Sequence, residues 1–77
     1  MKERIRQLRK DILKLNQTEF GKKIGLSPQA IGEIEKGRNE LTARNFEAIC
    51  RVWSVNPEWL RNGVGEVFIE PKEAVLQ

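Results

Sequence analysis

The stretch NQTEFGKKIGLSPQAIGEIEKGR, residues 16–38, decides the fold, because it contains the start and stop signals of two helices. Asn16 and Glu19 form a capping box, in which each side chain bonds the backbone amide of the other residue. Gly25 ends the first of these helices, since a left-handed C-terminal residue costs glycine little. The pair Ser27–Pro28 opens the second, because serine is a good N-cap and proline fits the first helical position.

A turn of three residues, Gly25-Leu26-Ser27, joins the two helices. Gly21 lies one turn before Gly25, and its missing side chain lets the second helix approach closely. Four large apolar residues fill the joint: Phe20, Ile24, Ile31 and Ile34. A short helix, a glycine-containing turn and a second helix held across the first make a helix-turn-helix.

Hydrophobic spacing and capping residues predict three further helices. The first spans residues 2–13. Thr42 caps a later helix, and the pair Asn56–Pro57 caps a short last one. The inward residues of these three helices, at helical spacing, are Ile5, Leu8, Ile12, Phe46, Ile49, Cys50, Trp53, Trp59 and Leu60. We therefore expect an all-α fold, with a compact five-helix domain over residues 1–63.

Residues 64–77 form a C-terminal extension. The turn signal Asn62–Gly63 precedes it, and residues 65–70 form a short apolar segment that could adopt a β conformation. We expect an extended tail that meets a second copy of the chain across a two-fold axis. The candidate dimer contacts are Val67, Phe68 and Ile69. The alternative is that Phe68 folds back as a lid over Trp59.

The composition argues against several classes of protein. With 77 residues the chain forms one domain. The single cysteine forms no intramolecular disulfide, and the lack of histidine argues against a zinc site. Apolar runs are too short for a membrane span, and the charged N-terminus is unlike a signal peptide. No paired carboxylates suggest acid–base catalysis. We therefore expect a cytoplasmic protein with no enzyme activity, metal, cofactor or small-molecule substrate.

Charge is unevenly distributed along the chain. The net charge is +3, but residues 1–38 contain ten Lys or Arg and five Asp or Glu, a balance of +5. A basic front half suits an anionic partner such as nucleic acid, and it equally suits a solvated surface. Charge alone does not decide between these interpretations.

The ordered residues 15–27, together with Ala30–Ile31 and residues 34–38, resemble the phage repressor and Cro family, also called the XRE type. Residues 55–60 and the pair Asn62–Gly63 are similar to the fifth helix of that family, so the resemblance covers roughly residues 4–63. It implies a lambda-repressor-like domain that binds double-stranded operator DNA, usually as a dimer.

The helix of residues 28–36 presents an outward face. With Ile31 and Ile34 pointing inward at about 100° per residue, Gln29 and Lys36 point directly outward. An outward face at the start of this helix is what a recognition helix needs in the major groove. The candidate base-reading residues are Ser27, Pro28, Gln29, Gly32 and Glu33. Their alternative role is that of ordinary solvent-facing helix residues.

Each of these side chains suits a particular contact. Gln29 can pair with the N6 and N7 edge of adenine, and Glu33 can accept from cytosine N4 or deter wrong sequences. Pro28, where the family usually has a polar residue, offers a surface suited to a thymine methyl. Gly32 leaves a gap in this face. Ser27 lies where a phosphate or base edge would approach.

A second set of residues suits the phosphate backbone. Gln17 begins a helix, where free amides and the helix dipole favour a phosphate, and its family counterpart has that role. The candidate phosphate contacts are Gln17, Lys36, Arg38, Asn39 and Arg44. Here too the alternative is a solvated surface.

The resemblance also implies an ion pair between Glu35 and a basic residue of the first helix, either Arg9 or Lys10. Such a pair, if exposed, would contribute about 0–1 kcal/mol. The stretch from Leu8 to Gln17 is one residue longer than the common spacing of the family, which leaves the register of the first helix open.

We interpret the chain as a sequence-specific DNA-binding transcriptional regulator, a repressor, that places the helix of residues 28–36 in the major groove. Its partners would be operator DNA and a second copy of the chain. The alternative is a protein-interaction module, such as an antitoxin or an adaptor, with the same fold. The basic front half favours DNA, whereas an exposed apolar C-terminal segment would favour a protein partner.

Overall fold

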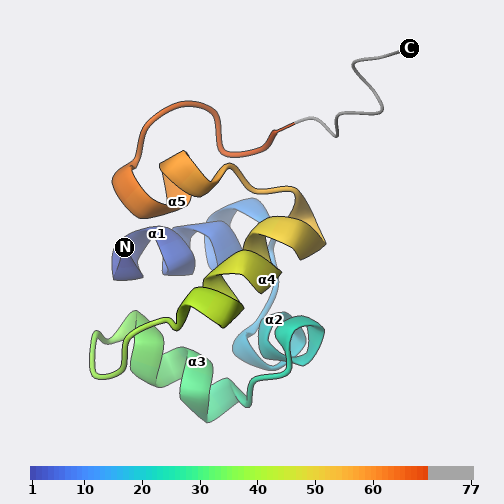
Figure 1. Ribbon diagram of the computed structural model, residues 1–77. Coiled ribbons are helices and arrows are strands. Elements are labelled where there is room, and N and C mark those ends of the chain that lie inside the picture. The colour runs from blue at the N-terminus through green and yellow to red at the C-terminus, as the bar shows by residue number, and fades with distance from the viewer. Residues whose placement is uncertain (70–77) are drawn as a thin grey trace.

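The computed structural model describes residues 1–69, and these form five α-helices and one π-helical segment (Figure 1). In chain order the elements are α1 (Lys2–Arg6), η1 (Gln7–Ile12), α2 (Gln17–Ile24), α3 (Pro28–Glu35), α4 (Ala43–Trp53) and α5 (Pro57–Asn62). The all-α prediction is therefore confirmed. The described part of the chain contains no helix long and apolar enough to cross a membrane.

Local hydrogen bonds set the helix starts where the sequence predicts them. Asn16 Oδ1 accepts from the Glu19 amide at 2.7 Å, and Glu19 Oε1 accepts from the Asn16 amide at 3.0 Å, which completes the capping box. Ser27, Thr42 and Asn56 cap α3, α4 and α5, each through a side-chain oxygen that accepts from one backbone amide of the first turn. Each cap contributes about 1 kcal/mol of stability.

The first predicted helix differs from expectation. Instead of one α-helix over residues 2–13, α1 continues into the π-helical segment η1. The Leu13 amide bonds the Leu8 carbonyl at 2.8 Å, five residues back rather than four. This bond encloses one more residue than an α-helical bond does. The π segment therefore takes up the extra residue between Leu8 and Gln17.

The core lies where the five helices meet. Its buried residues are Ile5, Leu8, Phe20, Ile31, Ile34, Phe46, Ile49, Val55, Trp59 and Leu60. The rings of Phe20 in α2 and Trp53 in α4 stack with centroids 4.7 Å apart, which ties the helix-turn-helix to the rest of the domain. Val55, in the short α4–α5 loop, is fully buried and was not among the expected core residues.

The segment after α5 turns back onto the domain instead of leaving it. Phe68 pairs with Val55 in an isolated antiparallel bridge, and the amide of Ile69 bonds the Ser54 carbonyl at 2.9 Å. Val67 packs against the core and is therefore poorly suited to its predicted role in a dimer contact. Phe68 is 44% and Ile69 48% exposed. The rest of the expected extension, residues 70–77, lies outside the described residues.

Gly21 and Gly32 offer a matched pair of glycine substitutions. A Cβ atom on Gly21 would overlap the carbonyl oxygen of Leu26 and lie 3.2 Å from Ile31 Cγ1, whereas one on Gly32 would meet only Gln17, at 3.5 Å. We predict that Gly21→Ala lowers the free energy of unfolding by about 1–3 kcal/mol through overpacking. Gly32→Ala should raise it by about 0.5–1 kcal/mol, because alanine is the better helix former.

Urea unfolding of the two variants beside wild type measures both changes. Equal stability of Gly21→Ala and wild type would show that α2 and the turn do not need this close approach.

Candidate nucleic-acid interface

The outward face of α3 lies in the middle of the candidate interface. Ile31 and Ile34 are buried and fix the opposite face of the helix against the core. Gln29 is exposed, and it borders a shallow hollow whose lining includes residues of both α3 and α2. The lining residues are Gln17, Pro28, Gln29, Gly32, Glu33 and Lys36. Residues predicted to contact bases and residues predicted to contact phosphates thus line the same hollow.

Ser27 lies at the exposed start of α3. Its Oγ accepts from the Ala30 amide at 3.1 Å, so the hydroxyl oxygen already serves as a cap. The hydroxyl proton is not used in this bond. Ser27 can therefore still donate to a phosphate or a base edge while it caps the helix.

Glu33 has a partner on the surface. Arg38 Nη1 lies 3.6 Å from Glu33 Oε2, with the Arg38 side chain 68% exposed. At that distance the contact is an ion pair, and Glu33 Oε2 accepts no hydrogen bond from residues 1–69. The pair keeps the Glu33 carboxylate close to the positive charge of Arg38, which lowers its repulsion of an approaching phosphate.

A buried ion pair is connected to the hollow through Gln17. Arg9 Nε donates to Glu35 Oε2 at 2.6 Å and Arg9 Nη2 to Glu35 Oε1 at 3.0 Å, with the two side chains only 10% and 6% exposed. Arg9 Nη1 also donates to the Leu15 carbonyl at 3.0 Å. The pair is thus buried, so the value given for an exposed pair does not apply. Of the two candidates it is Arg9 that meets Glu35, while Lys10 is exposed.

Gln17 belongs to the same network. Its Nε2 donates to Glu35 Oε1 at 3.3 Å, which holds the side chain over Gly32. Gln17 therefore connects the buried ion pair to the surface of α3. As the first residue of α2, it also keeps its backbone amide at the helix start, where an anion is favoured.

The other candidate phosphate contacts lie around the C-terminal end of α3. Lys36, Arg38 and Asn39 are exposed on the α3–α4 loop, and Arg44 is exposed in the first turn of α4. Figure 1 shows that this loop leads from α3 directly into α4. Of these residues Lys36 also lines the hollow, whereas Arg38, Asn39 and Arg44 lie outside its lining.

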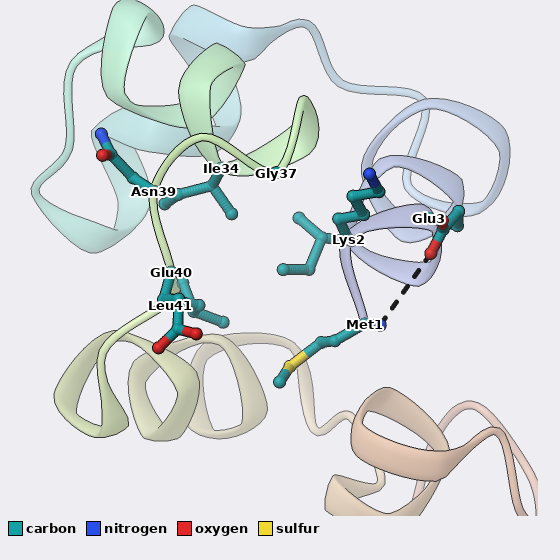
Figure 2. Close-up of a pocket in the computed structure, with 9 residues that line it drawn as sticks. Met1, Lys2, Glu3, Ile34, Gly37, Asn39, Glu40 and Leu41 are labelled. Carbon is teal, nitrogen blue, oxygen red and sulfur yellow. Dashed lines mark ion pairs between the residues drawn. The ribbon is translucent and has the colours of Figure 1, made fainter.

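Sequence reasoning missed Lys2. Figure 2 shows this side chain extending from α1 toward Gly37, and a Cβ atom on Gly37 would lie 3.0 Å from Lys2 Nζ. The ammonium group is therefore next to the loop that carries Arg38 and Asn39. No spacing signal could have revealed this, because the contact joins residues far apart in the sequence.

Arg4, another cation of the first helix, has a structural role. Its Nε donates to the Leu60 carbonyl at 3.0 Å and its Nη2 to the Arg61 carbonyl at 2.6 Å. These are carbonyls of the last turn of α5, which a positive charge stabilises. Arg4 therefore connects α1, the first helix, to α5, the last one.

Cys50 shows no sign of reactivity. Burial raises the pKa of its thiol above the usual value, although Arg61 acts in the opposite direction. A thiol with a raised pKa stays protonated and is a poor nucleophile. Within residues 1–69 no group of three or more Cys, Asp or Glu side chains is placed to hold a metal ion.

Comparison with known proteins agrees with this geometry. A family model described as helix-turn-helix matches residues 5–60. Repressor protein C2 of Salmonella phage P22 is 36% identical over 63 residues, which is 82% of this chain and 29% of that protein. The chain thus spans less than a third of the length of this relative. No solved structure matches the chain significantly.

The buried pair predicts an asymmetric response to mutation. Arg9→Met should lower the free energy of unfolding by about 3–5 kcal/mol, because it leaves the Glu35 carboxylate buried without its partner. The double variant Arg9→Met, Glu35→Leu should recover most of that loss, since both charges are gone. Lys10→Met is the matched control, with little effect expected at an exposed position.

Urea unfolding of the four proteins tests this. If Arg9→Met cost no more than Lys10→Met, the ion pair would not stabilise the joint.

Proposed function

This chain belongs to the helix-turn-helix family of the phage-repressor type, and on that basis we propose that it is a sequence-specific DNA-binding transcriptional regulator that acts as a repressor. The observation that carries the proposal is the outward face of α3, which is exposed at Gln29 and anchored by the buried Ile31 and Ile34. In this role the protein binds DNA in the cytoplasm and catalyses no reaction.

In the proposed complex, α3 lies in the major groove and reads base edges. Gln29 pairs with adenine through its amide, which supplies both a donor and an acceptor. Glu33 accepts from cytosine N4, or excludes sequences that bring an acceptor to the same place. Ser27 donates its free hydroxyl proton at the start of the helix. The exposure of Ser27 and Gln29 supports these assignments.

Phosphate contacts fix α3 in the groove. The Gln17 amide at the start of α2 binds one phosphate, and the cations of the α3–α4 loop and α4 bind others. The proposed phosphate contacts are Gln17, Lys36, Arg38, Asn39 and Arg44, to which the position of Lys2 beside Gly37 adds a sixth. Such contacts carry no sequence information directly, so they set affinity and orientation.

We further propose that two copies bind one operator. A single recognition helix contacts only a few base pairs, which is too little to find one site in a genome. In the docking geometry of helix-turn-helix dimers, two copies read half-sites about 34–36 Å apart. The exposed side chains of Phe68 and Ile69, on a segment already held by the Val55 bridge, supply the proposed contact between copies.

The same exposed side chains favour a second candidate function. Phe68, Ile69 and the neighbouring Val64, which is 60% exposed, offer apolar surface to a different protein. An antitoxin or an adaptor would use such a surface. A chain that binds no duplex DNA but forms a complex through this segment would fit this alternative.

Positioning and reading residues should respond differently to mutation. Arg44→Ala should weaken binding to all sequences alike and reduce the slope of log K against log salt by about 0.9, because it removes one phosphate contact. Gln29→Ala should leave the slope unchanged and lose about 1–3 kcal/mol of discrimination at one base pair. Lys10→Ala is a control for an exposed cation that is not among the proposed contacts.

Fluorescence anisotropy on a selected site and its single-base variants, at several salt concentrations, measures both effects. Failure of wild type to bind any duplex at low salt would refute the DNA-binding proposal. A uniform loss for Gln29→Ala would show that it does not read a base.

The role of Phe68 is tested by Phe68→Asp, which places a charge in the proposed contact between copies. We expect wild type to bind a full operator as two copies and the variant to lose at least about tenfold in affinity for it, because two linked binding events become independent. Val52→Asp, which places the same charge at an exposed apolar residue of α4, is the control. Analytical ultracentrifugation with and without operator gives the stoichiometry.

If wild type binds with one copy per operator, the dimer proposal is wrong. If circular dichroism shows that Phe68→Asp is unfolded, Phe68 belongs to the core instead.

A further inference from the structure

The segment after α5 is held to the domain along one of its two edges. The Asn56 amide donates to the Val67 carbonyl at 2.7 Å, and the Ile69 amide donates to the Ser54 carbonyl at 2.9 Å. Asn56 Nδ2 also donates to the Glu66 carbonyl at 3.0 Å. These three hydrogen bonds fix the inner edge of the segment against the loop between α4 and α5.

The pattern of these bonds decides which way the backbone of Phe68 faces. In an antiparallel pair, opposite residues either exchange both hydrogen bonds or lie between bonds made by their neighbours. Val55 and Phe68 are of the second kind, because the residues on either side of them make the bonds. The N–H and C=O groups of Phe68 therefore point away from Val55, toward the outer edge of the segment. Within residues 1–69 neither group has a backbone partner.

The outer edge has little of the protection that free strand edges usually carry. Proteins cover such an edge, or place lysine, proline or a bulge on it, because unpaired backbone groups otherwise pair with another chain. The stretch 64–69 contains no lysine and no proline, and its one charged residue is Glu66. The side chains of Phe68 and Ile69 are 44% and 48% exposed. The segment thus offers a partner both hydrogen-bonding groups and apolar surface.

We infer that this outer edge pairs with the same edge of a second copy, as two antiparallel strands related by a two-fold axis that passes between the two Phe68 residues. The N–H of each Phe68 then donates to the C=O of the other, which satisfies both outward groups at once. The contact is self-complementary, because each copy offers the same donor and the same acceptor. The two phenyl rings belong to directly opposite residues, where aromatic pairs add stability.

This pairing rests on the proposed function, since it describes how two copies meet on one operator. It goes further in assigning the contact to the backbone atoms of Phe68 in addition to exposed side chains. Such a contact depends on the amide hydrogen at position 68, and it tolerates another apolar side chain there.

The test replaces that amide hydrogen by a methyl group. A chain with N-methylphenylalanine at position 68 is assembled by ligating residues 1–49 to synthetic residues 50–77 at Cys50. It should unfold in urea at the same concentration as wild type, because the Phe68 amide has no backbone partner within residues 1–69. On a full operator selected by wild type from a random duplex pool, it should lose at least about fivefold in affinity, since both hydrogen bonds across the axis are lost. Its affinity for an isolated half-site should not change.

Two matched controls separate the outer edge from its surroundings. N-methylation of Ile69 acts on the inner edge, so it should destabilise the fold by breaking the bond to the Ser54 carbonyl. Phe68→Leu keeps both the amide hydrogen and an apolar side chain, so it should lose less affinity for the full operator than N-methylation of Phe68 does.

The inference is overturned if the chain methylated at Phe68 binds the full operator as two copies and as tightly as wild type. The dimer proposal would then stand on side-chain contacts alone. It is also overturned if that chain is less stable than wild type, because the amide would then serve within the domain. A wild type that binds the operator as one copy overturns it as well, while the DNA-binding proposal stands.

If wild type binds no duplex, the proposed function fails, and sedimentation of the free proteins over a range of concentrations tests the edge by itself. Self-association that N-methylation of Phe68 weakens would support the pairing. A wild type that stays monomeric, or self-association that N-methylation leaves unchanged, would overturn it.

Discussion

A charged pair buried where three segments of the chain meet controls the geometry of the recognition face. Removing Arg9 and Glu35 from water is costly, and two short hydrogen bonds between them repay that cost only because the geometry is good. Glu35 is the last residue of α3, where the helix dipole is negative and a carboxylate is unfavourable. Arg9 therefore offsets both the cost of burying the Glu35 carboxylate and its unfavourable interaction with the helix dipole. The third hydrogen bond of Arg9, to the Leu15 carbonyl, fixes the chain just before α2.

The π-helical segment is tied to the position of this pair. Arg9 lies within η1, where the extra enclosed residue changes the direction in which side chains leave the helix. Its neighbour Lys10 remains exposed, so the local backbone decides which of two adjacent cations turns inward. From Glu35 the network continues to Gln17 and so to the surface over Gly32. A one-residue irregularity in the first helix thus positions side chains on the third.

The features that the sequence predicted correctly are local ones. The caps at Asn16 and Ser27 each join residues three positions apart, so a short window contains all the information. The spacing of Ile5, Leu8 and Ile12 is that of an α-helix, and the extra residue before Gln17 did not show by itself where the chain would accommodate it, so η1 was not foreseen. The contacts of Lys2 and Arg4 join segments from opposite ends of the domain, and only the packed structure brings those together. The roles of the outward residues of α3 remain predictions, because they depend on a partner.

The basic front half offers fewer free cations to the interface than its ten Lys and Arg residues suggest. Arg9 is buried against Glu35, and Arg4 is bound to carbonyls of α5. Non-specific attraction to phosphates grows with the number of cations that can neutralise them, so a face with several committed cations binds any DNA less strongly. One copy then has to obtain its affinity from a few base contacts, which are too few to select a site. A second copy doubles both kinds of contact without adding non-specific attraction per chain. The distribution of charge within one domain is thus itself a reason to expect that two domains act together on an operator.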